Sequence, residues 1–418
     1  MSVENAKIDF KRFRETMEAS SEIGRVKDTG LYRLALSDKD KEMRDLFRKW
    51  MEEAGLEVRI DDVGTMYGRR AGKEDLPPVL IGSHLDTQPY GGRYDGVIGV
   101  LMALEAIRTM NDYNIETRRP IEIVNFTNEE GARFEPPMMA SGLLAGEFTK
   151  EFVHSRKDAE GLEFGEELGR IGYRGTEENR IKDIHSFVEV HIEQGPRLEK
   201  EGRDIGIVRG IQGVSWFEVT VQGKSNHAGS TPMHLRKDPM MAAARLISDL
   251  EELALEESVL MTIGKISASP GAVNVIPETV NFSIDVRSED DEERNGFIRL
   301  LEERVGAIAS LKNVDIDVDH TWTSPVTHFN SDVLEVISSK SESLGYSTLD
   351  IVSGAGHDAR YINDIAPTAM IFAPSVGGIS HDIAELTLDA YLEKCGTLLF
   401  EVVRELADRD EIAFDQEG

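Results

Sequence analysis

The sequence predicts an α/β protein in which one α/β domain is interrupted by a smaller α+β domain. Short apolar runs typical of buried strands alternate with amphipathic helical segments up to residue 210, and this pattern resumes after residue 325. Between these points the predicted order is β-α-β-β-α-β, which is that of a ferredoxin-like sandwich. A chain of 418 residues is also too long for one ordinary domain. We therefore expect a discontinuous larger domain, residues 1–210 and 326–418, and an inserted domain, residues 211–325.

The elements of the larger domain follow from the spacing of its apolar residues. Residues 8–56 have helical spacing that stops at Gly55. Strands are expected at 56–59, 64–68, 79–83, 121–126, 187–192 and 367–372. Helices are expected at 97–110, 158–168, 331–344 and 386–406. Because strands and helices alternate, the prediction is a mixed sheet flanked by helices.

In the inserted domain, the alternation of Phe217, Val219 and Val221 marks a strand with one buried face. This strand is expected at 215–222, with further strands at 260–267, 280–287 and 314–319 and helices at 238–254 and 289–311. An edge strand of such a sheet would offer a route to dimerisation.

Charge and composition exclude several classes of partner. The formal net charge is −30 and the sequence pI is about 4.8. Nucleic acids and anionic membranes require a basic face, so neither is expected as a partner. No apolar run approaches the ~18 residues of a spanning helix, and residues 1–12 are too polar for a secretory signal. The single cysteine, Cys395, allows no internal disulfide, and we expect a cytoplasmic protein.

The stretch from Gly82 to Gly96, G-S-H-L-D-T-Q-P-Y-G-G-R-Y-D-G, lies between a predicted buried strand and a predicted helix. The strand end therefore delivers His84, Asp86 and Asp95 into a glycine-rich loop. One imidazole and two carboxylates suit a divalent transition metal, zinc first. Taken alone, the stretch is as compatible with an ordinary hydrogen-bonded histidine.

Ligand-type side chains also follow other predicted strands. The strand at 121–126 leads into Glu129 and Glu130, the strand at 187–192 contains His191, and His381 lies in G-G-I-S-H. Adjacent carboxylates repel, and such a pair is tolerable if one binds a metal while the other handles protons. The alternative interpretation is that the two glutamates lie in a solvent-exposed acidic turn. In open α/β sheets ligands gather where strands end, so these segments are consistent with one site.

Three histidines and two acids match the needs of two zinc ions if one carboxylate bridges them. These five residues are His84, Asp95, Glu130, His191 and His381. Two metals about 3.5–4 Å apart can activate water near neutral pH and stabilise the charge on an attacked carbonyl.

Five motifs carry a family resemblance. They are the stretch from Gly82 to Gly96, N-E-E-G-x-R-F, H-I-E-Q-G-P-x-L-E, S-N-H-A-G-S-T-P-M and G-G-I-S-H. They resemble the di-zinc amidohydrolases that act on N-carbamoyl-L-amino acids, a family close to β-ureidopropionase and allantoate amidohydrolase within the aminoacylase/carboxypeptidase superfamily. The motifs span residues 82–385 in the same order. The resemblance implies a di-zinc aminopeptidase-like catalytic domain and an inserted dimerisation domain.

The resemblance also implies a role for each metal-site residue. His84, Asp95 and His191 would hold one metal, and Asp95 would bridge to a second metal held by Glu130 and His381. Zinc is expected, and manganese or cobalt is chemically admissible.

Two further residues receive catalytic roles from the resemblance. Glu129 would be the general base, and Asp86 would fix the orientation of the His84 ring from behind. A cis peptide is implied between Asp95 and Gly96.

The substrate-binding residues implied by the resemblance are Gln194, His227, Asn274 and Arg287. Arg287 suits a carboxylate clamp, because its planar fork binds a carboxylate in a bidentate manner. His227 would reach the active site of the partner subunit and polarise the attacked carbonyl, which implies a homodimer.

Two features fit the family pattern less directly. His357 and Asp358 are expected to have a structural role next to the site. The last motif continues as Ser380-His381-Asp382-Ile383-Ala384-Glu385 where family members often have S-H-N-P-A-E, so this loop is expected to depart from the family's shape. No motif surrounds His154, His185, His234, His320 or His328, which are expected to be ordinary polar residues.

The predicted activity is hydrolysis of the carbamoyl C–N bond of an N-carbamoyl-L-amino acid to the amino acid, ammonia and carbon dioxide. Allantoate amidohydrolase and β-ureidopropionase are the nearest alternatives, and both also take small ureido substrates. A dipeptidase or aminoacylase would differ in the acyl pocket, and a scaffold protein without catalysis would have no reason to keep Glu129.

Overall fold

The computed structural model describes residues 6–414, which form two compact units. Unit 1 comprises the chain up to Gly210 and again from His328, and unit 2 is Ile211–Thr327. Among the described residues, none of the helices combines the length and apolar character needed to span a bilayer.

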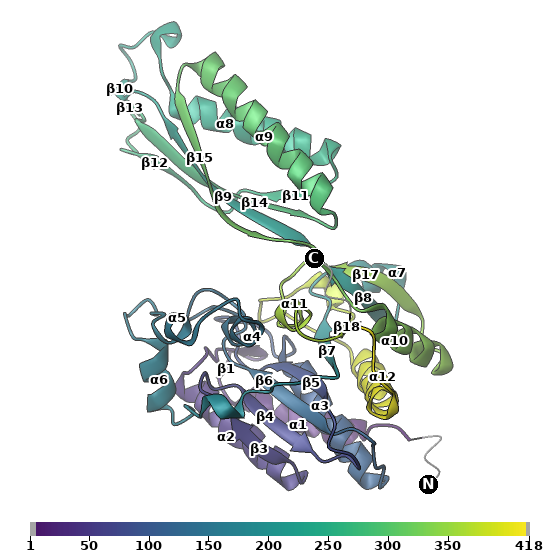
Figure 1. Cartoon of the computed structure of the whole chain (residues 1–418). Helices are drawn as coiled ribbons and strands as arrows, with labels where there is room; N and C mark the ends of the chain where they lie inside the picture. The colour runs from purple at the N-terminus through teal and green to yellow at the C-terminus, as the bar shows by residue number, and fades with distance from the viewer. Residues whose placement is uncertain (1–5, 415–418) are drawn as a thin grey trace. The chain divides into compact units, whose positions relative to one another are not determined.

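Unit 1 is built around a nine-stranded mixed sheet (Figure 1). Its strands follow the order β16-β8-β18-β7-β5-β6-β4-β3, and β17 pairs with β8 outside this path. The bounds are β3 (Glu57–Ile60), β4 (Met66–Arg70), β5 (Val79–His84), β6 (Ile121–Phe126), β7 (Ser186–Ile192), β8 (Ile205–Ile211), β16 (Thr327–His328), β17 (Thr348–Ser353) and β18 (Thr368–Ala373). A separate two-stranded sheet pairs β1 (Arg25–Val26) with β2 (Gly30–Leu31).

Four neighbouring strands of the large sheet, β18, β7, β5 and β6, run parallel to one another. Each is buried along its whole length, which explains why the sequence shows them as continuous apolar runs. Parallel strands end at the same edge of a sheet. The segments that follow them are therefore brought together there, as the sequence predicts for ligand positions.

Helix α3 (Val97–Asp112) is buried on nearly every side and packs against β5, β6, β7 and α12. A helix that is apolar all round belongs in a core, and α3 forms the centre of unit 1. The remaining helices of unit 1 are α1 (Phe10–Glu22), α2 (Asp38–Glu53), α4 (Met139–Ala145), α5 (Lys150–His154), α6 (Phe164–Arg170), α7 (Arg197–Glu201), α10 (Ser331–Ser343), α11 (Ala359–Ile362) and α12 (Asp389–Asp408).

Unit 2 has the predicted ferredoxin-like order. Its antiparallel sheet runs β11-β14-β9-β15, and β12 also pairs with β14. The apolar face of β9, with Phe217, Val219 and Val221, packs with Leu246 of α8 and Phe297 of α9 in one core. The bounds are β9 (Gly213–Gln222), α8 (Pro239–Glu256), β11 (Leu260–Thr262), β12 (Ile266–Ser269), β14 (Thr279–Ser288), α9 (Asp291–Lys312) and β15 (Asp315–Ser324). A separate two-stranded antiparallel sheet pairs β10 (Asn226–His227) with β13 (Val275–Ile276).

Three predicted elements are wrong in detail. The helical stretch expected at 8–56 is two helices, α1 and α2, separated by the β1–β2 pair. The helix expected at 158–168 begins only at Phe164, because the carboxylate of Asp158 accepts the N–H groups of Glu160 and Leu162 at 3.0 Å and turns the chain. The strand expected at 260–267 is two strands, β11 and β12. Four residue steps from Thr262 to Ile266 oppose three on β14, so this strand carries a bulge.

Candidate active site

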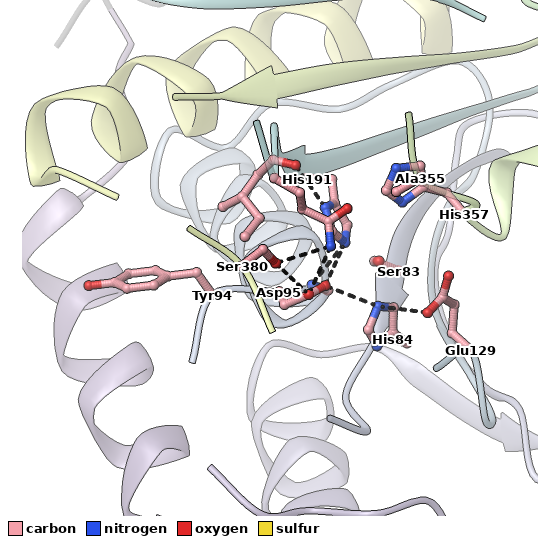
Figure 2. Close-up of polar contacts among 12 residues, drawn as sticks. Ser83, His84, Tyr94, Asp95, Glu129, His191, Ala355, His357 and Ser380 are labelled. Atoms are coloured by element: carbon pink, nitrogen blue, oxygen red, sulfur yellow. Dashed lines mark hydrogen bonds and ion pairs between the residues drawn. The ribbon is translucent and has the colours of Figure 1, made fainter. Parts of the chain in front are cut away.

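The first group of ligand-type side chains comprises His84 at the end of β5, His191 near the end of β7, and Asp95 in the loop before α3. All three are buried. Nε2 of His191 lies 3.0 Å from Oδ1 of Asp95, and Nε2 of His84 lies 3.8 Å from the same oxygen. Figure 2 shows both rings directed at Asp95.

The second group comprises Asp95, Glu130 and His381. Nε2 of His381 lies 3.3 Å from Oδ2 of Asp95 and 3.6 Å from Oε2 of Glu130. Asp95 therefore presents one carboxylate oxygen to each group. The His381 side chain is 51% exposed, so the second group is the more open of the two. The structure brings together all five residues that the sequence predicts as metal ligands.

The two buried rings are held with Nε2 toward the site. Nδ1 of His84 donates to the carbonyl of Asp86, and Nδ1 of His191 donates to the carbonyl of Ile192, both at 3.0 Å. In its neutral form, each ring carries its proton on Nδ1 and offers the Nε2 lone pair to a metal. Nε2 of His84 is buried without a hydrogen-bond partner, which a divalent cation at this point would satisfy. The donor set of imidazoles and carboxylates fits zinc.

Burial and neighbouring charge set the electrostatics of the site. Burial alone would raise the pKa of Asp95, but hydrogen bonds from His191 and His381 hold it well below its usual value. Burial, followed by the repulsion of nearby carboxylates, raises the pKa of Glu129 and of Glu130 well above the usual range. A divalent cation would offset this repulsion and favour the ionised carboxylates.

Glu129, the predicted general base, lies beside the first group. Its Oε2 is 3.4 Å from Nε2 of His84. The N–H groups of Glu129 and Glu130 each donate to the carboxylate of Asp86 at 3.3 Å. The carboxylate of Asp86 therefore holds the backbone of the two glutamates. Asp86 lies behind the His84 ring, as expected, but it contacts Nδ1 through its backbone carbonyl, while its carboxylate lies 4.0 Å from Nδ1.

The cis peptide expected between Asp95 and Gly96 is wrong. Within the described residues, the cis bonds precede Pro136 and Pro270. The chain reverses at Gly96 instead through a positive φ of 65°, with the N–H of Val97 donating to the carbonyl of Asp95 at 2.6 Å. A Cβ at Gly96 would lie 2.3 Å from the His84 ring, so glycine is required for both reasons.

Glu385 links the loop of Asp95 to the loop of His381. It accepts hydrogen bonds from the N–H groups of Tyr94 and Asp95 at 3.0 and 3.1 Å and from the hydroxyl of Ser380 at 3.1 Å. Sequence reasoning assigned neither Glu385 nor Ser380 a role, although the spacing S-H-x-x-x-E was a usable signal.

The loop that departs from the family pattern has a defined shape. The carboxylate of Asp382 accepts the N–H of Ala384 at 2.8 Å, which forms a tight turn. The carbonyl of Ile383 accepts the hydroxyl of Thr29 at 2.6 Å. The substituted residues thus tie this loop to the β1–β2 segment.

Gln194 is the predicted substrate residue that lies within unit 1. Its Nε2 donates to Oδ2 of Asp95 at 3.0 Å and to the hydroxyl of Ser380 at 3.2 Å. Its Oε1 is buried without a hydrogen-bond partner. The structure therefore places Gln194 against both ligand groups.

The other predicted substrate residues lie in unit 2. Nδ1 of His227 accepts the N–H groups of Gly229 and Ser230, both at 3.1 Å. The neutral ring therefore carries its proton on Nε2 and can donate to a carbonyl oxygen. The carbonyl of Asn274 accepts the N–H of Ala228 at 3.1 Å, so Asn274 and His227 are brought close together.

Arg287 lies on β14 and is held by a carboxylate that sequence reasoning missed. Its Nε and Nη2 donate to the two oxygens of Asp285, each at 2.9 Å. Asp285 also accepts from the indole of Trp216 at 2.8 Å. Residues two apart on a strand share one face, so the spacing D-x-R was the available signal.

His357 and Asp358 lie next to the first group, as expected. The ring centre of His357 is 4.4 Å from that of His191, and Nε2 contacts the hydroxyl of Ser353 at 3.0 Å. The hydroxyl of Ser141 donates to Asp358 at 2.5 Å. Glu189 joins His191 and His357 in a further buried group of ligand-type side chains that sequence reasoning did not identify.

A mixed sheet whose parallel strands end in two His/carboxylate groups, with a buried glutamate beside them, defines a metal-dependent hydrolase. The family model for peptidase family M20/M25/M40 matches residues 80–405. The chain belongs to the hydantoinase/carbamoylase family within the M20 superfamily, and it is an amidohydrolase acting on C–N bonds.

Three relatives carry this assignment. An N-carbamoyl-L-amino-acid amidohydrolase of Rhizobium meliloti is 42% identical over 408 residues, covering 97% of this chain and 98% of that protein. An allantoate amidohydrolase of Bacillus subtilis is 34% identical, with 94% and 95% covered. The crystal structure of a hydantoinase/carbamoylase family amidase from Burkholderia multivorans has a TM-score of 0.92 at 41% identity, with 97% and 99% covered.

Proposed function

We propose that the protein hydrolyses N-carbamoyl-L-amino acids to the L-amino acid, ammonia and carbon dioxide. The observation that carries this proposal is the single carboxylate of Asp95, shared between two ligand groups, with Glu129 3.4 Å from His84. The similarity to carbamoylases over nearly the whole chain supports the choice of substrate.

Two divalent ions, most simply zinc, are proposed as the cofactor, and manganese or cobalt would also suit the donors. His84, Asp95 and His191 would hold one ion, and Asp95, Glu130 and His381 the other. Such a pair supplies Lewis acidity that polarises the substrate carbonyl and lowers the pKa of water at the site.

Glu129 moves the proton in this scheme. Its carboxylate accepts a proton from the attacking water and passes it to the departing amino-acid nitrogen, while the new C–O bond replaces the C–N bond. The raised pKa that burial gives Glu129 suits a group that must both accept and return a proton. The released carbamic acid breaks down to ammonia and carbon dioxide.

The substrate is held by Gln194, His227, Asn274 and Arg287. Nε2–H of His227 donates to the carbonyl oxygen as charge develops on it, and Arg287 binds the substrate carboxylate. In this proposal His227 acts in the site of the partner subunit, so the working form is a homodimer. We place the enzyme in the cytoplasm, consistent with a single, buried cysteine.

The alternative is allantoate amidohydrolase, favoured by the similarity to the Bacillus subtilis protein. The metal groups would be the same, and the ureido substrate would differ. An ammonia-release screen over N-carbamoyl-L-amino acids, N-carbamoyl-β-alanine, allantoate, a dipeptide and an N-acetyl-amino acid, with and without added zinc, separates these activities. Turnover of allantoate alone would reassign the protein, and no turnover of any compound would favour a scaffold.

Glu129→Gln tests the proposed base. The variant keeps both ligand groups and should bind zinc as the wild type does. Its ammonia release should fall by at least about 10²-fold, the smaller end of what general-base catalysis supplies. Near wild-type turnover by the zinc-loaded variant would contradict the role of Glu129.

A further inference from the structure

Gln88 donates hydrogen bonds to both oxygens of the Glu130 carboxylate. Its side-chain Nε2 donates to Oε2 of Glu130 at 2.8 Å, and its backbone N–H donates to Oε1 at 3.2 Å. The same Nε2 lies 3.4 Å from the carbonyl of Glu130. Gln88 follows β5 and Glu130 follows β6, so these contacts also connect two loops at the carboxyl edge of the sheet.

The second ligand group needs such support more than the first. In the first group, backbone carbonyls of Asp86 and Ile192 fix the two rings inside the core. In the second group the Glu130 side chain is buried, but its partner His381 is half-exposed. The carboxylates of Asp95 and Asp86 also act on Glu130, and they repel its ionised form, the form that would bind a metal.

We propose that Gln88 is a positioning residue that fixes the Glu130 carboxylate and thereby sets the metal affinity of the second ligand group. The inference rests on the metal assignment of the proposed function. The amide of Gln88 adds no charge, so it orients the carboxylate without competing with a cation as a lysine or arginine would. Each carboxylate oxygen that accepts one hydrogen bond keeps further lone-pair capacity for a metal.

The backbone of Gln88 is itself fixed. The neighbouring Thr87 donates its N–H to the carbonyl of Arg33 at 2.9 Å, and its hydroxyl accepts the N–H of Arg33 at 3.0 Å. Arg33 is fully buried. The carbonyl of Gln88 accepts the N–H of Gly91 at 3.1 Å. The donor is therefore presented from a rigid loop, as an outer partner of a metal ligand should be.

Gln88→Met tests the inference, because methionine keeps the length and apolar stem but removes the donor. Zinc bound per chain is measured by equilibrium dialysis over a range of free zinc. We expect the affinity of the second ion to fall about 10- to 100-fold, with that of the first unchanged. Ammonia release should recover at saturating zinc. Gln222→Met, at an exposed glutamine on β9 of unit 2, is the matched control and should bind zinc as the wild type does.

Gln88→Glu provides a second variant that keeps the shape and places a carboxylate opposite Glu130. This variant should lower the affinity for the second ion at least as much as Gln88→Met does. Equal unfolding midpoints of the metal-free variants and wild type would separate positioning from folding. Wild-type affinity for both ions in both variants overturns the inference, as does a wild-type protein that binds fewer than two ions. A wild type that binds two ions without hydrolysing a carbamoyl substrate overturns the proposed function and leaves the affinity comparison standing.

Discussion

Whether a histidine in this protein can serve as a ligand depends on what its two ring nitrogens face. His84 and His191 place Nδ1 on a backbone carbonyl and direct Nε2 at Asp95. His185 is also buried and its Nε2 also lacks a hydrogen-bond partner, but the charged groups that act on it are Arg119 and Arg118 rather than carboxylates. Burial together with these positive charges lowers the pKa of His185 to about 4, so it is a neutral core residue.

The low pKa of His185 predicts a pH dependence of stability. The unfolded chain binds a proton at His185 near pH 6.5 and the folded chain near pH 4, so acidification through this window favours unfolding. Relative to His185→Gln, the metal-free wild type should lose up to about 1 kcal/mol of stability per pH unit between these values. Urea unfolding at several pH values measures this difference, and parallel curves for the two proteins would contradict it.

At this scale the sequence picks out the five candidate ligands because each lies at a strand end or in a glycine-bounded loop. The partners that hold them are harder to predict. Gln88 and Glu130 are 42 residues apart, and Tyr94 and Glu385 are 291 apart. Pairs of this kind depend on which strands are neighbours in the sheet, and no local pattern in the chain encodes that. Motif spacing therefore identifies the candidate ligands and misses the residues that hydrogen-bond to them.

The carboxyl edge of the parallel strands positions the site, and the pairing of β5 with β6 places His84 beside the segment of Glu129 and Glu130. At Gly82 the two strands approach too closely to leave room for a side chain. Its φ is +149°, and a Cβ there would lie 2.0 Å from the carbonyl oxygen of Val124 on β6. Any side chain at Gly82 must therefore push the two strands apart.

Gly82→Ala is expected to destabilise the protein by about 3 kcal/mol, the upper range for overpacking. It should also reduce ammonia release at saturating zinc, because the two loops separate. Gly169→Ala in α6 is the matched control, since a Cβ there meets nothing within 4 Å. That variant should be neutral or more stable by roughly 0.5–1 kcal/mol. Thermal unfolding compares the two, and similar midpoints would show that the strands tolerate the methyl group.

Elements with a strong local pattern are predicted within a few residues, as β6 and β7 show. β8 and β17 were not predicted. β8, I-G-I-V-R-G-I, contains two glycines and owes its strand conformation to pairing with β18 and β17. Strand preference of this kind comes from the neighbouring strand rather than from the segment itself.

For the whole molecule, the predicted residues are divided between two units. Unit 1 carries Gln194 and all five proposed ligands, and unit 2 carries His227, Asn274 and Arg287. If His227 acts in the partner's site, each site draws on two chains. That arrangement makes a specific prediction about mixed dimers.

Glu129→Gln and His227→Asn should each be nearly inactive alone. After subunit exchange, the mixed dimer has one site with Glu129 from one chain and His227 from the other, so activity should return to about a quarter of wild type for random pairing. Ammonia release before and after exchange measures this. If His227 acts within its own chain, no mixture regains activity.

The strands through which the chain leaves and re-enters unit 1 are neighbours. β16 pairs with β8, and the N–H of Phe329 donates to the carbonyl of Arg209 at 2.9 Å. A few glycine and serine residues could therefore replace 211–327 without stretching the remaining fold. Such a truncated enzyme should still capture zinc while being unable to turn over a carbamoyl compound. Metal binding would then need only unit 1, whereas substrate binding would also need unit 2.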